Sequence, residues 1–280
     1  MTHRKELPFL LTLLEDNSSV VREVVVSALR EFGPGLSVEV APYLRDLGQE
    51  AREVLDLITA SMPAMPQSWL DWLDIEHAAT AHEDALTRLS VMTYGQEALR
   101  IGPMLDELAV GFLAWAEAGS VPELMEFIFQ QEGFSPPRER DYSPLYDDLY
   151  FVLRHKQGTQ IALSSIAMLV ASRVGLEVHG ISIQGNFMVI TLEGQQMQMY
   201  NTFNKGRALA RASILYIEEA FRRNRLSPRD MKAQVYEIVQ QVLANAIEIT
   251  RRKGQDKDYQ RYSSLYEELT RSLRSRDANI

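Results

Sequence analysis

The segment from Gly158 to Leu176 constrains the fold more than any other part of the chain. At helical spacing its apolar side chains fall on every side, and Gly175-Leu176 ends the pattern. A helix that is apolar all round has no face for water, so it has to be buried by other elements. Its large apolar members are Ile161, Leu163, Ile166, Met168, Leu169, Val170 and Val174. The sequence therefore predicts one central, buried helix.

Short strand-like segments follow this helix at residues 177–183, 187–192 and 196–200. They are separated by the turns Gln184-Gly185-Asn186 and Glu193-Gly194. Turns this short join antiparallel neighbours, so the pattern predicts a small antiparallel sheet packed on the buried helix. Elsewhere the apolar residues recur mainly at helical spacing. The expected fold class is α+β, mostly α.

Residues 1–62 are predicted to form two helical hairpins related by a shift of 30 residues. Val21-Arg22-Glu23-Val24 recurs as Ala51-Arg52-Glu53-Val54, and the first unit ends Ala28-Leu29-x-x-Phe32-Gly33. This pattern resembles a HEAT-type repeat, in which neither hairpin hides its apolar face alone. A protein-binding surface and a structural cap both remain open for this module. The apolar stripe of its second helix comprises Val21, Val24, Val25, Ala28, Leu29 and Phe32.

The rigid segment Met62-Pro63-Ala64-Met65-Pro66 gives the best internal boundary. We expect a HEAT-like domain at 1–62 and a second domain at 67–280. Within the second, the core spans 133–214 and C-terminal helices span 215–276. Those helices are expected to pack on the core, or alternatively to form a homodimer.

The charge distribution argues against nucleic acid as the main partner. The net charge is −9; residues 222–280 carry 13 basic and 8 acidic groups, and the other 221 residues carry 16 and 30. The acidic body repels phosphates. The chain shows no targeting segment and no apolar run of about 20 residues, the length a membrane span needs. We expect a cytoplasmic protein without membrane contact.

Several short motifs follow one another around the buried helix. They are Gly133-Phe134, Tyr142-Ser143-Pro144, the helix start Gly158-Thr159-Gln160, the turn Gly185-Asn186-Phe187 and the strand end Asn201-Thr202-Phe203. In this order, over roughly 80 residues, the chain resembles the bacterial SirB-one family, whose members carry a transglutaminase-like, papain-like core. Members often continue into tetratricopeptide repeats, but the C-terminal helices here show no 34-residue period.

The resemblance also implies where a catalytic site would lie. It maps the nucleophile position onto Gln160, the histidine position onto Asn186 and the acid position onto Asn201. The chain contains no cysteine, and an amide at each position supplies neither a nucleophile nor a proton relay. We therefore expect no catalytic residue and a pseudoenzyme. The three amides are expected to converge, and either satisfy one another or bind an amide or peptide backbone.

Other catalytic arrangements find little support in the sequence. Ser164 is predicted to be a small packing residue on the buried helix, and the acidic pair Asp147-Asp148 would diverge on a helix. The five histidines have no spacing typical of a metal site, so no metal or cofactor is expected. The function expected is a non-catalytic protein-binding or regulatory factor with an unidentified protein partner. The alternative is a residual amide or peptide hydrolase with a non-standard site.

Overall fold

The computed structural model describes residues 3–14, 18–30, 40, 43, 47–60, 68–138, 142–183, 185–193, 196–225, 227 and 231–277. They divide into two compact units, one formed by Met1–Asp71 with Arg88–Arg100 and the other by Trp72–Thr87 with Ile101–Ile280. The proline-rich boundary expected at 62–66 lies outside the described residues. The division into domains at 62 and 67 stays a prediction.

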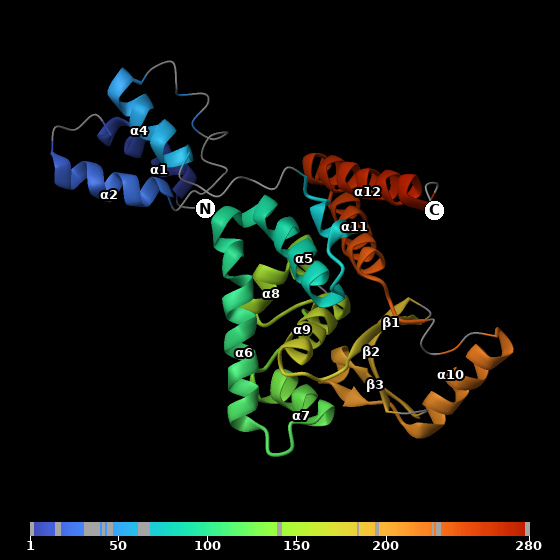
Figure 1. Cartoon of the computed structure of the whole chain (residues 1–280). Coiled ribbons are helices and arrows are strands. Elements are labelled where there is room, and N and C mark those ends of the chain that lie inside the picture. Colours follow the sequence, from blue (N-terminus) through green and yellow to red (C-terminus); the bar gives the residue numbers. More distant parts are fainter. Residues whose placement is uncertain are drawn as a thin grey trace. The chain divides into compact units, whose positions relative to one another are not determined.

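The first unit is helical (Figure 1). It has its own apolar core. Helices α1 (His3–Leu13), α2 (Ser19–Arg30) and α4 (Gln49–Ala60) contribute to it. Val24 was expected in the apolar stripe of α2, but it is 65% exposed, because the buried face runs through Val25 and Leu29. The core residues are Leu7, Leu11, Leu14, Val25, Leu29, Val40, Leu47, Ala51, Leu55 and Ile58.

The second unit contains the sheet and most of the helices. After η2 (Asp71–Asp74), its helices are α5 (Ala78–Tyr94) up to Thr87, α6 (Ile101–Trp115), α7 (Val121–Glu126), α8 (Leu149–His155), α9 (Gln160–Arg173), α10 (Arg211–Arg223), α11 (Val235–Arg252) and α12 (Asp256–Asp277). From Arg88 on, α5 belongs to the first unit. Its short helical turns are η4 (Phe127–Gln131), η6 (Pro144–Asp147) and η7 (Thr202–Asn204). The turn η3 (Gly95–Arg100) belongs to the first unit. None of the described helices combines the length and apolar character that crossing a membrane requires.

The sheet has the antiparallel order β1-β2-β3-β4. Its strands are β1 (His179–Ile183), β2 (Asn186–Glu193), β3 (Gln196–Asn201) and β4 (Arg207–Ala208). Strands β1 to β3 match the three predicted segments, whereas the two-residue β4 was not predicted. The α+β, mostly helical fold class is confirmed.

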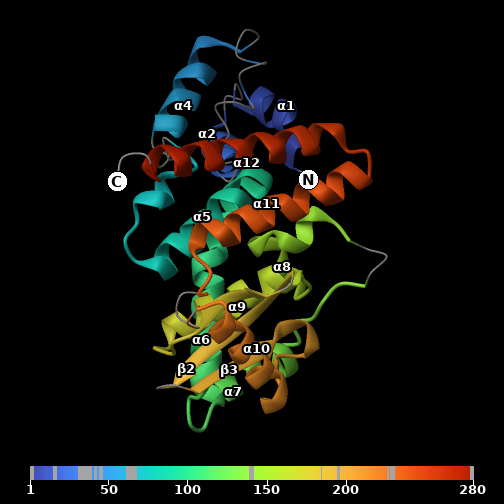
Figure 2. The ribbon, with the colours of Figure 1, turned by 90° about the vertical axis from the view of Figure 1, so that its right-hand side faces the viewer.

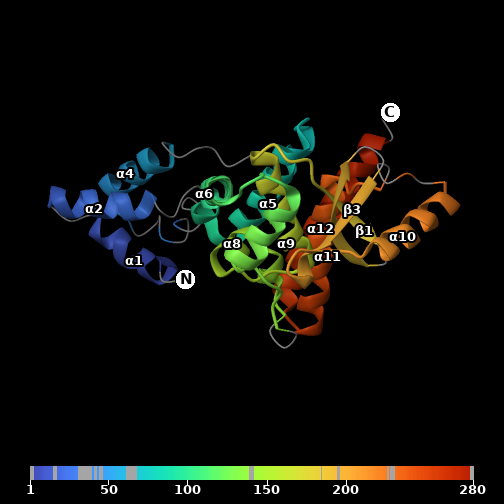
Figure 3. The same ribbon diagram turned by 90° about the horizontal axis from the view of Figure 1, so that it is seen from below.

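Helix α9 is the centre of the second unit, as the sequence predicted. Eleven of its fourteen residues, Ile161 to Ala171, are buried. It packs on β1 and β2 and also contacts α6, α7, α8 and α11. Figures 1 and 3 show the sheet lying between α9 on one side and α10 on the other. Both faces of the sheet are therefore covered by helices.

The C-terminal helices α11 and α12 pack against each other as a helical hairpin (Figure 2). Helix α11 also contacts η6 and α9. Its buried side chains include Ile238, Val239, Val242 and Leu243. This packing carries residues near 245 to the N-terminal end of α9.

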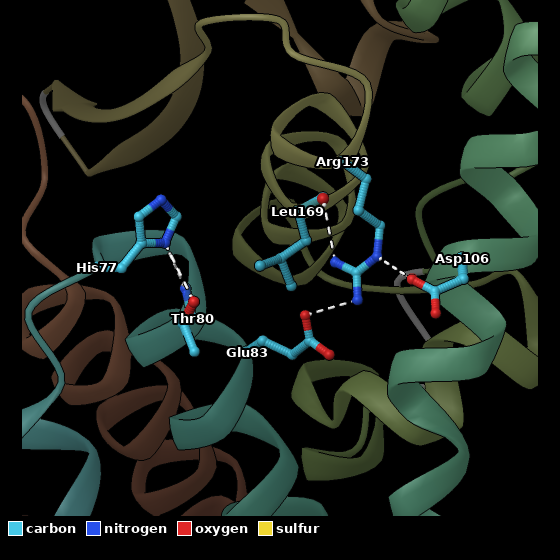
Figure 4. A network of polar contacts seen from close by, with 6 residues as sticks. All are labelled: His77, Thr80, Glu83, Asp106, Leu169 and Arg173. Carbon is cyan, nitrogen blue, oxygen red and sulfur yellow. Dashed lines mark hydrogen bonds and ion pairs between the residues drawn. The ribbon is translucent and has the colours of Figure 1, made fainter.

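Arg173 ties the C-terminal end of α9 to α5 and α6 (Figure 4). Its Nη2 lies 2.7 Å from Glu83 Oε2, and its Nε donates to Asp106 Oδ1 at 2.6 Å. A third hydrogen bond runs from Nη1 to the Leu169 carbonyl at 3.3 Å. The guanidinium fork thus holds three segments in one geometry.

Candidate functional site

The N-terminal end of α9 is built by a capping residue and its neighbours. Thr159 is the N-cap, and its hydroxyl oxygen accepts from the Ala162 N–H at 3.4 Å. The Thr159 N–H in turn donates to the Tyr146 carbonyl at 2.8 Å, which joins the cap to η6. Gln160 is the first residue of the helix. Its own N–H and that of Ile161 belong to the first turn, which has no intrahelical acceptors.

Asp147 lies beneath this cap, and it is 3% exposed. Its Oδ1 accepts one hydrogen bond from the Thr159 hydroxyl and another from Asn245 Nδ2 at 3.2 Å. Asn245 Oδ1 accepts from Gln241 Nε2 at 2.9 Å, so α11 supplies two residues to the arrangement. Among the described residues, nothing donates to or accepts from the other carboxyl oxygen, Oδ2.

Burial raises the pKa of the Asp147 carboxyl to about 7. The hydrogen bonds from Thr159 and Asn245 favour the charged form and limit the rise, while the nearby charge of Asp148 adds to it. A desolvated carboxylate is costly, which explains why the proton is retained to near-neutral pH. Asp147 therefore titrates in the range where a small change in its surroundings alters its charge.

A cavity of about 290 Å³ opens at this end of α9. Its walls come from η6, the start of α9, the β1–β2 hairpin, η7 and α11. The lining residues are Tyr142, Asp147, Thr159, Gln160, Ile161, Ser182, Gly185, Phe187, Phe203, Gln241, Asn245, Glu248, Ile249 and Arg252. Aromatic walls and converging polar groups are typical of small-ligand sites.

Gln160 lies in this cavity, and its side chain bridges the helix to the sheet. Its Oε1 accepts from the Phe187 N–H at 3.3 Å. Its main-chain carbonyl accepts from the Thr202 hydroxyl at 3.3 Å, which in turn lies 3.1 Å from Ser164 Oγ. The amide at the expected nucleophile position thus helps to hold α9 against β2.

Strand geometry turns the side chains of Asn186 and Asn201 to the other face of the sheet, although their chain neighbours Phe187 and Thr202 bond to Gln160;. Asn186 is exposed and pairs with Ile183, which packs in the apolar cluster on the α10 face of the sheet. Met197 and Met199 of β3 belong to the same cluster. Because alternate residues of a strand point to the same face, Asn201 also lies on the α10 face of the sheet. Phe187 instead belongs to the α9 face with Ser182, its partner on β1. Of the three amides, Gln160 is among the described residues that line the cavity, and Asn186 and Asn201 are not.

Asn201 has a local structural role. Its Oδ1 accepts from the Phe203 N–H at 3.0 Å and so caps η7. The adjacent Thr202, which is fully buried, is the residue that reaches α9. This hydroxyl was not predicted as part of the site.

The acidic pair Asp147-Asp148 differs from its predicted arrangement on a helix. Asp147 closes η6, and Asp148 is the N-cap of α8, where its Oδ1 accepts from the Phe151 N–H at 3.0 Å. The sequence contained a capping signal in the Ser143-Pro144 start of this turn. The burial of the Asp147 carboxyl beneath the start of α9 depends on tertiary packing, and no motif in the sequence indicates it.

A buried Ser–His pair lies deeper in the unit. His82 Nε2 is 3.0 Å from Ser165 Oγ, with His82 4% exposed and Ser165 fully buried. Burial lowers the pKa of His82 to about 4, so the ring is neutral near pH 7. No group of three acidic or histidine side chains in the described part of the chain could hold a metal ion.

Comparisons with known proteins identify the superfamily of this part of the chain. The family model of the transglutaminase-like superfamily matches residues 100–252, more than half of the chain. Two UPF0162 proteins of Xylella fastidiosa, from strains Temecula1 and 9a5c, are each 31% identical over 83 residues. The alignment covers 30% of this chain and 30% of each relative, and no solved structure matches significantly. The chain belongs to the transglutaminase-like superfamily.

Proposed function

We propose that this transglutaminase-like domain works without catalysis, as a protein-binding or regulatory factor. The observation that carries the proposal is the residue at the start of α9. There the amide oxygen of Gln160 accepts a hydrogen bond from the Phe187 N–H. An amide in that role positions the sheet and offers its NH₂ group to a ligand, but it forms no covalent intermediate.

The neighbouring groups support the same proposal. Among the described residues that line the cavity there is no histidine, so none of them supplies an imidazole to relay a proton. Ser164 and Ser165 on α9 are fully buried, and each is already hydrogen-bonded within the protein. The runner-up function, a residual amide or peptide hydrolase, finds its best candidate in the His82–Ser165 pair. That hydroxyl lies where no substrate carbonyl reaches it in this conformation.

Three finer assignments belong with this proposal. We propose SirB-one membership on the order of the motifs between Gly133 and Phe203. We propose a HEAT-like character for the first unit on the 30-residue recurrence. We also propose that the protein is cytoplasmic and that its C-terminal helices pack on the core rather than dimerise. Sedimentation of the full chain at two concentrations tests whether the chain dimerises.

Two assays on the full chain test the main proposal. The first measures ammonia release and amine incorporation on a peptide substrate, and we expect no turnover above buffer. Turnover that disappears in Ser165→Ala would instead establish the hydrolase. The second compares affinity capture by the wild type, by Gln160→Arg, which places a long charged side chain in the cavity, and by Gln260→Arg, an exposed control on α12. A partner lost only with Gln160→Arg is the expected result; a partner bound equally by all three would exclude this site.

A further inference from the structure

Two buried side-chain polar atoms in the described part of the chain have no hydrogen-bond partner, Asp147 Oδ2 and Trp72 Nε1. Buried polar atoms are normally hydrogen-bonded. Asp147 Oδ1 has two donors, from Thr159 and Asn245, whereas Oδ2 is buried and has no partner among the described residues. Asp147 is one of the residues that line the cavity. A ligand in the cavity is the natural partner for this atom.

The hydrogen bonds also decide which oxygen carries the proton. Oδ1 already accepts two hydrogen bonds, so the proton of the neutral acid belongs on Oδ2. A protonated Oδ2 is a buried donor without a partner among the described residues, in a side chain that lines the cavity. The neutral acid is well populated near neutral pH, because burial raises the pKa of Asp147 to about 7.

Other groups at this end of the cavity are donors as well. Gln160 Nε2 makes no hydrogen bond within the described part of the chain, since only the amide oxygen is engaged. The first-turn N–H groups of Gln160 and Ile161 are free of intrahelical acceptors and carry the positive end of the α9 dipole. The 14 residues of α9 make this a full helix N-terminus. A ligand that satisfies this set needs acceptor oxygens.

We infer that the cavity binds a carboxylate, held by Asp147, Gln160 and the first turn of α9. The inference rests on the proposed non-catalytic function and names the ligand class of that site. The cavity, about 290 Å³, has room for one amino-acid residue or a small acid. Its aromatic walls, Phe187 and Phe203, contact the apolar part. The carboxylate comes either from a peptide C-terminus or from an acidic side chain.

Charged groups around Asp147 are compatible with an anion. Glu248 of α11 lines the cavity, but its carboxylate pairs with Arg252 at 2.6 Å and with Arg251 at 2.5 Å. Arg252 itself is a second lining residue and contributes positive charge. Asp148 turns to cap α8, and Tyr262 of α12 is neutral near pH 7, since burial raises the pKa of its phenol further. The first turn of α9 carries no acidic residue.

Calorimetric titration of the full chain with N-acetylglycine tests the inference. The matched uncharged probe is N-acetylglycinamide, which we expect not to bind. Because binding uses the protonated acid, affinity for N-acetylglycine should fall about tenfold between pH 6 and pH 8 as the protonated fraction falls. Titrations in two buffers of different ionisation enthalpy should show proton uptake at pH 8. Equal binding of both probes, no binding, or an affinity that rises with pH would each overturn the inference.

Variants identify the groups responsible. Asp147→Asn keeps the two accepted hydrogen bonds on its oxygen and presents an N–H donor to the cavity that does not titrate. It should bind N-acetylglycine at both pH values with the wild-type pH 6 affinity. Gln160→Ala should weaken binding about two- to tenfold at both pH values, and Gln260→Ala should have no effect. If the affinity of Asp147→Asn still fell tenfold between pH 6 and pH 8, Asp147 would not be the group that binds the carboxylate. If that variant does not fold, the proton uptake of the wild type at pH 8 still tests whether binding uses a protonated acid.

Two peptides separate the sources of the carboxylate. One has a free C-terminus and no acidic side chain, and the other is C-terminally amidated with one internal glutamate. Binding of only the first identifies a C-terminus, binding of only the second identifies a side chain, and failure of both overturns the inference. Because these probes need no partner or turnover, their failure leaves the capture and turnover assays of the proposed function as independent results.

Discussion

Asn245 on α11 donates a hydrogen bond to Asp147 on η6 at 3.2 Å, across 98 positions of sequence. This bond joins the C-terminal helical hairpin to the N-terminal end of the buried helix. It also gives a hydrogen bond to one oxygen of a buried carboxyl group. The link gives the site a role in stability that can be measured apart from ligand binding.

The first prediction concerns this hydrogen bond. Asn245→Ala removes one of the two donors to Asp147 Oδ1 and leaves a buried acceptor underused. We expect a loss of about 1–2 kcal/mol in the free energy of unfolding, measured by urea titration. Gln260→Ala, an exposed change on α12, should stay within about 0.5 kcal/mol of the wild type. A variant of Asn245 as stable as the wild type would show that the bond contributes little.

The second prediction is a pH dependence set by Asp147. Its pKa rises from 3.8 to about 7 on folding. Between these values the unfolded chain loses its proton while the native protein keeps it, so this group makes the native state less stable as pH increases. In Asp147→Asn the dependence is absent. The stability of the variant relative to the wild type should therefore grow by about 1.4 kcal/mol per pH unit from pH 4 to pH 7, and stay constant above.

Urea titrations of both proteins at half-unit pH steps measure this difference. Subtracting the two curves cancels the titration of every other group that the substitution leaves unchanged. Parallel curves across the whole range would mean that Asp147 has an ordinary pKa in the folded protein.

The third prediction has the opposite sign and concerns His82. Burial lowers its pKa from 6.5 to about 4. As pH falls between these values, His82 becomes protonated in the unfolded chain but stays neutral in the native protein. The free energy of unfolding therefore decreases by about 1.4 kcal/mol per pH unit. His82→Gln keeps a polar group near Ser165 but does not titrate. Its stability relative to the wild type should rise as pH falls from 6.5 to 4; a pH-independent difference would contradict the burial of a neutral ring.

The fourth prediction concerns Arg173, whose side chain is 19% exposed and bonds to Glu83 and Asp106. Arg173→Ala should cost roughly 1–3 kcal/mol, because Glu83, whose side chain is 25% exposed, loses its counter-charge;. Arg223→Ala is the matched control. It breaks an i,i+4 pair with Glu219 whose side chains are 77% and 45% exposed, and surface pairs of this kind contribute about 0–0.5 kcal/mol. Equal losses in the two variants would show that Arg173 does not hold α5, α6 and α9 together.

The sequence predicted the elements of the core closely. The all-apolar pattern after Gly158 identified α9 within two residues, because a helix without a polar face has one stable environment;. The three strands of the β1–β3 meander were found from their turns and apolar residues. The prediction for Val24 was wrong, since this side chain is exposed. The apolar stripe of α2 is wider than the buried face of the helix, so the sequence does not show which apolar side chain stays in water.

For the site, the sequence identified one member of the cavity. Gln160 was placed at the start of α9, whereas Asn186 and Asn201 were expected beside it. Strand β2 is apolar on both faces, Phe187 and Val189 alternating with Met188 and Ile190. Since helices cover both faces of the sheet, alternation in the sequence gives no sign of which residues face α9.

What the sequence determined by itself is local: where helices and strands form, and that the chain has no thiol for the chemistry of a cysteine enzyme. The side of the sheet that a residue occupies, the pairing of Asp147 with Asn245, and the burial that brings a carboxyl pKa to about 7 were decided by tertiary structure. Periodicity records whether a residue meets water, but not which distant residue it meets. The charge state of a buried acid depends on that distant environment, so only the folded chain sets it.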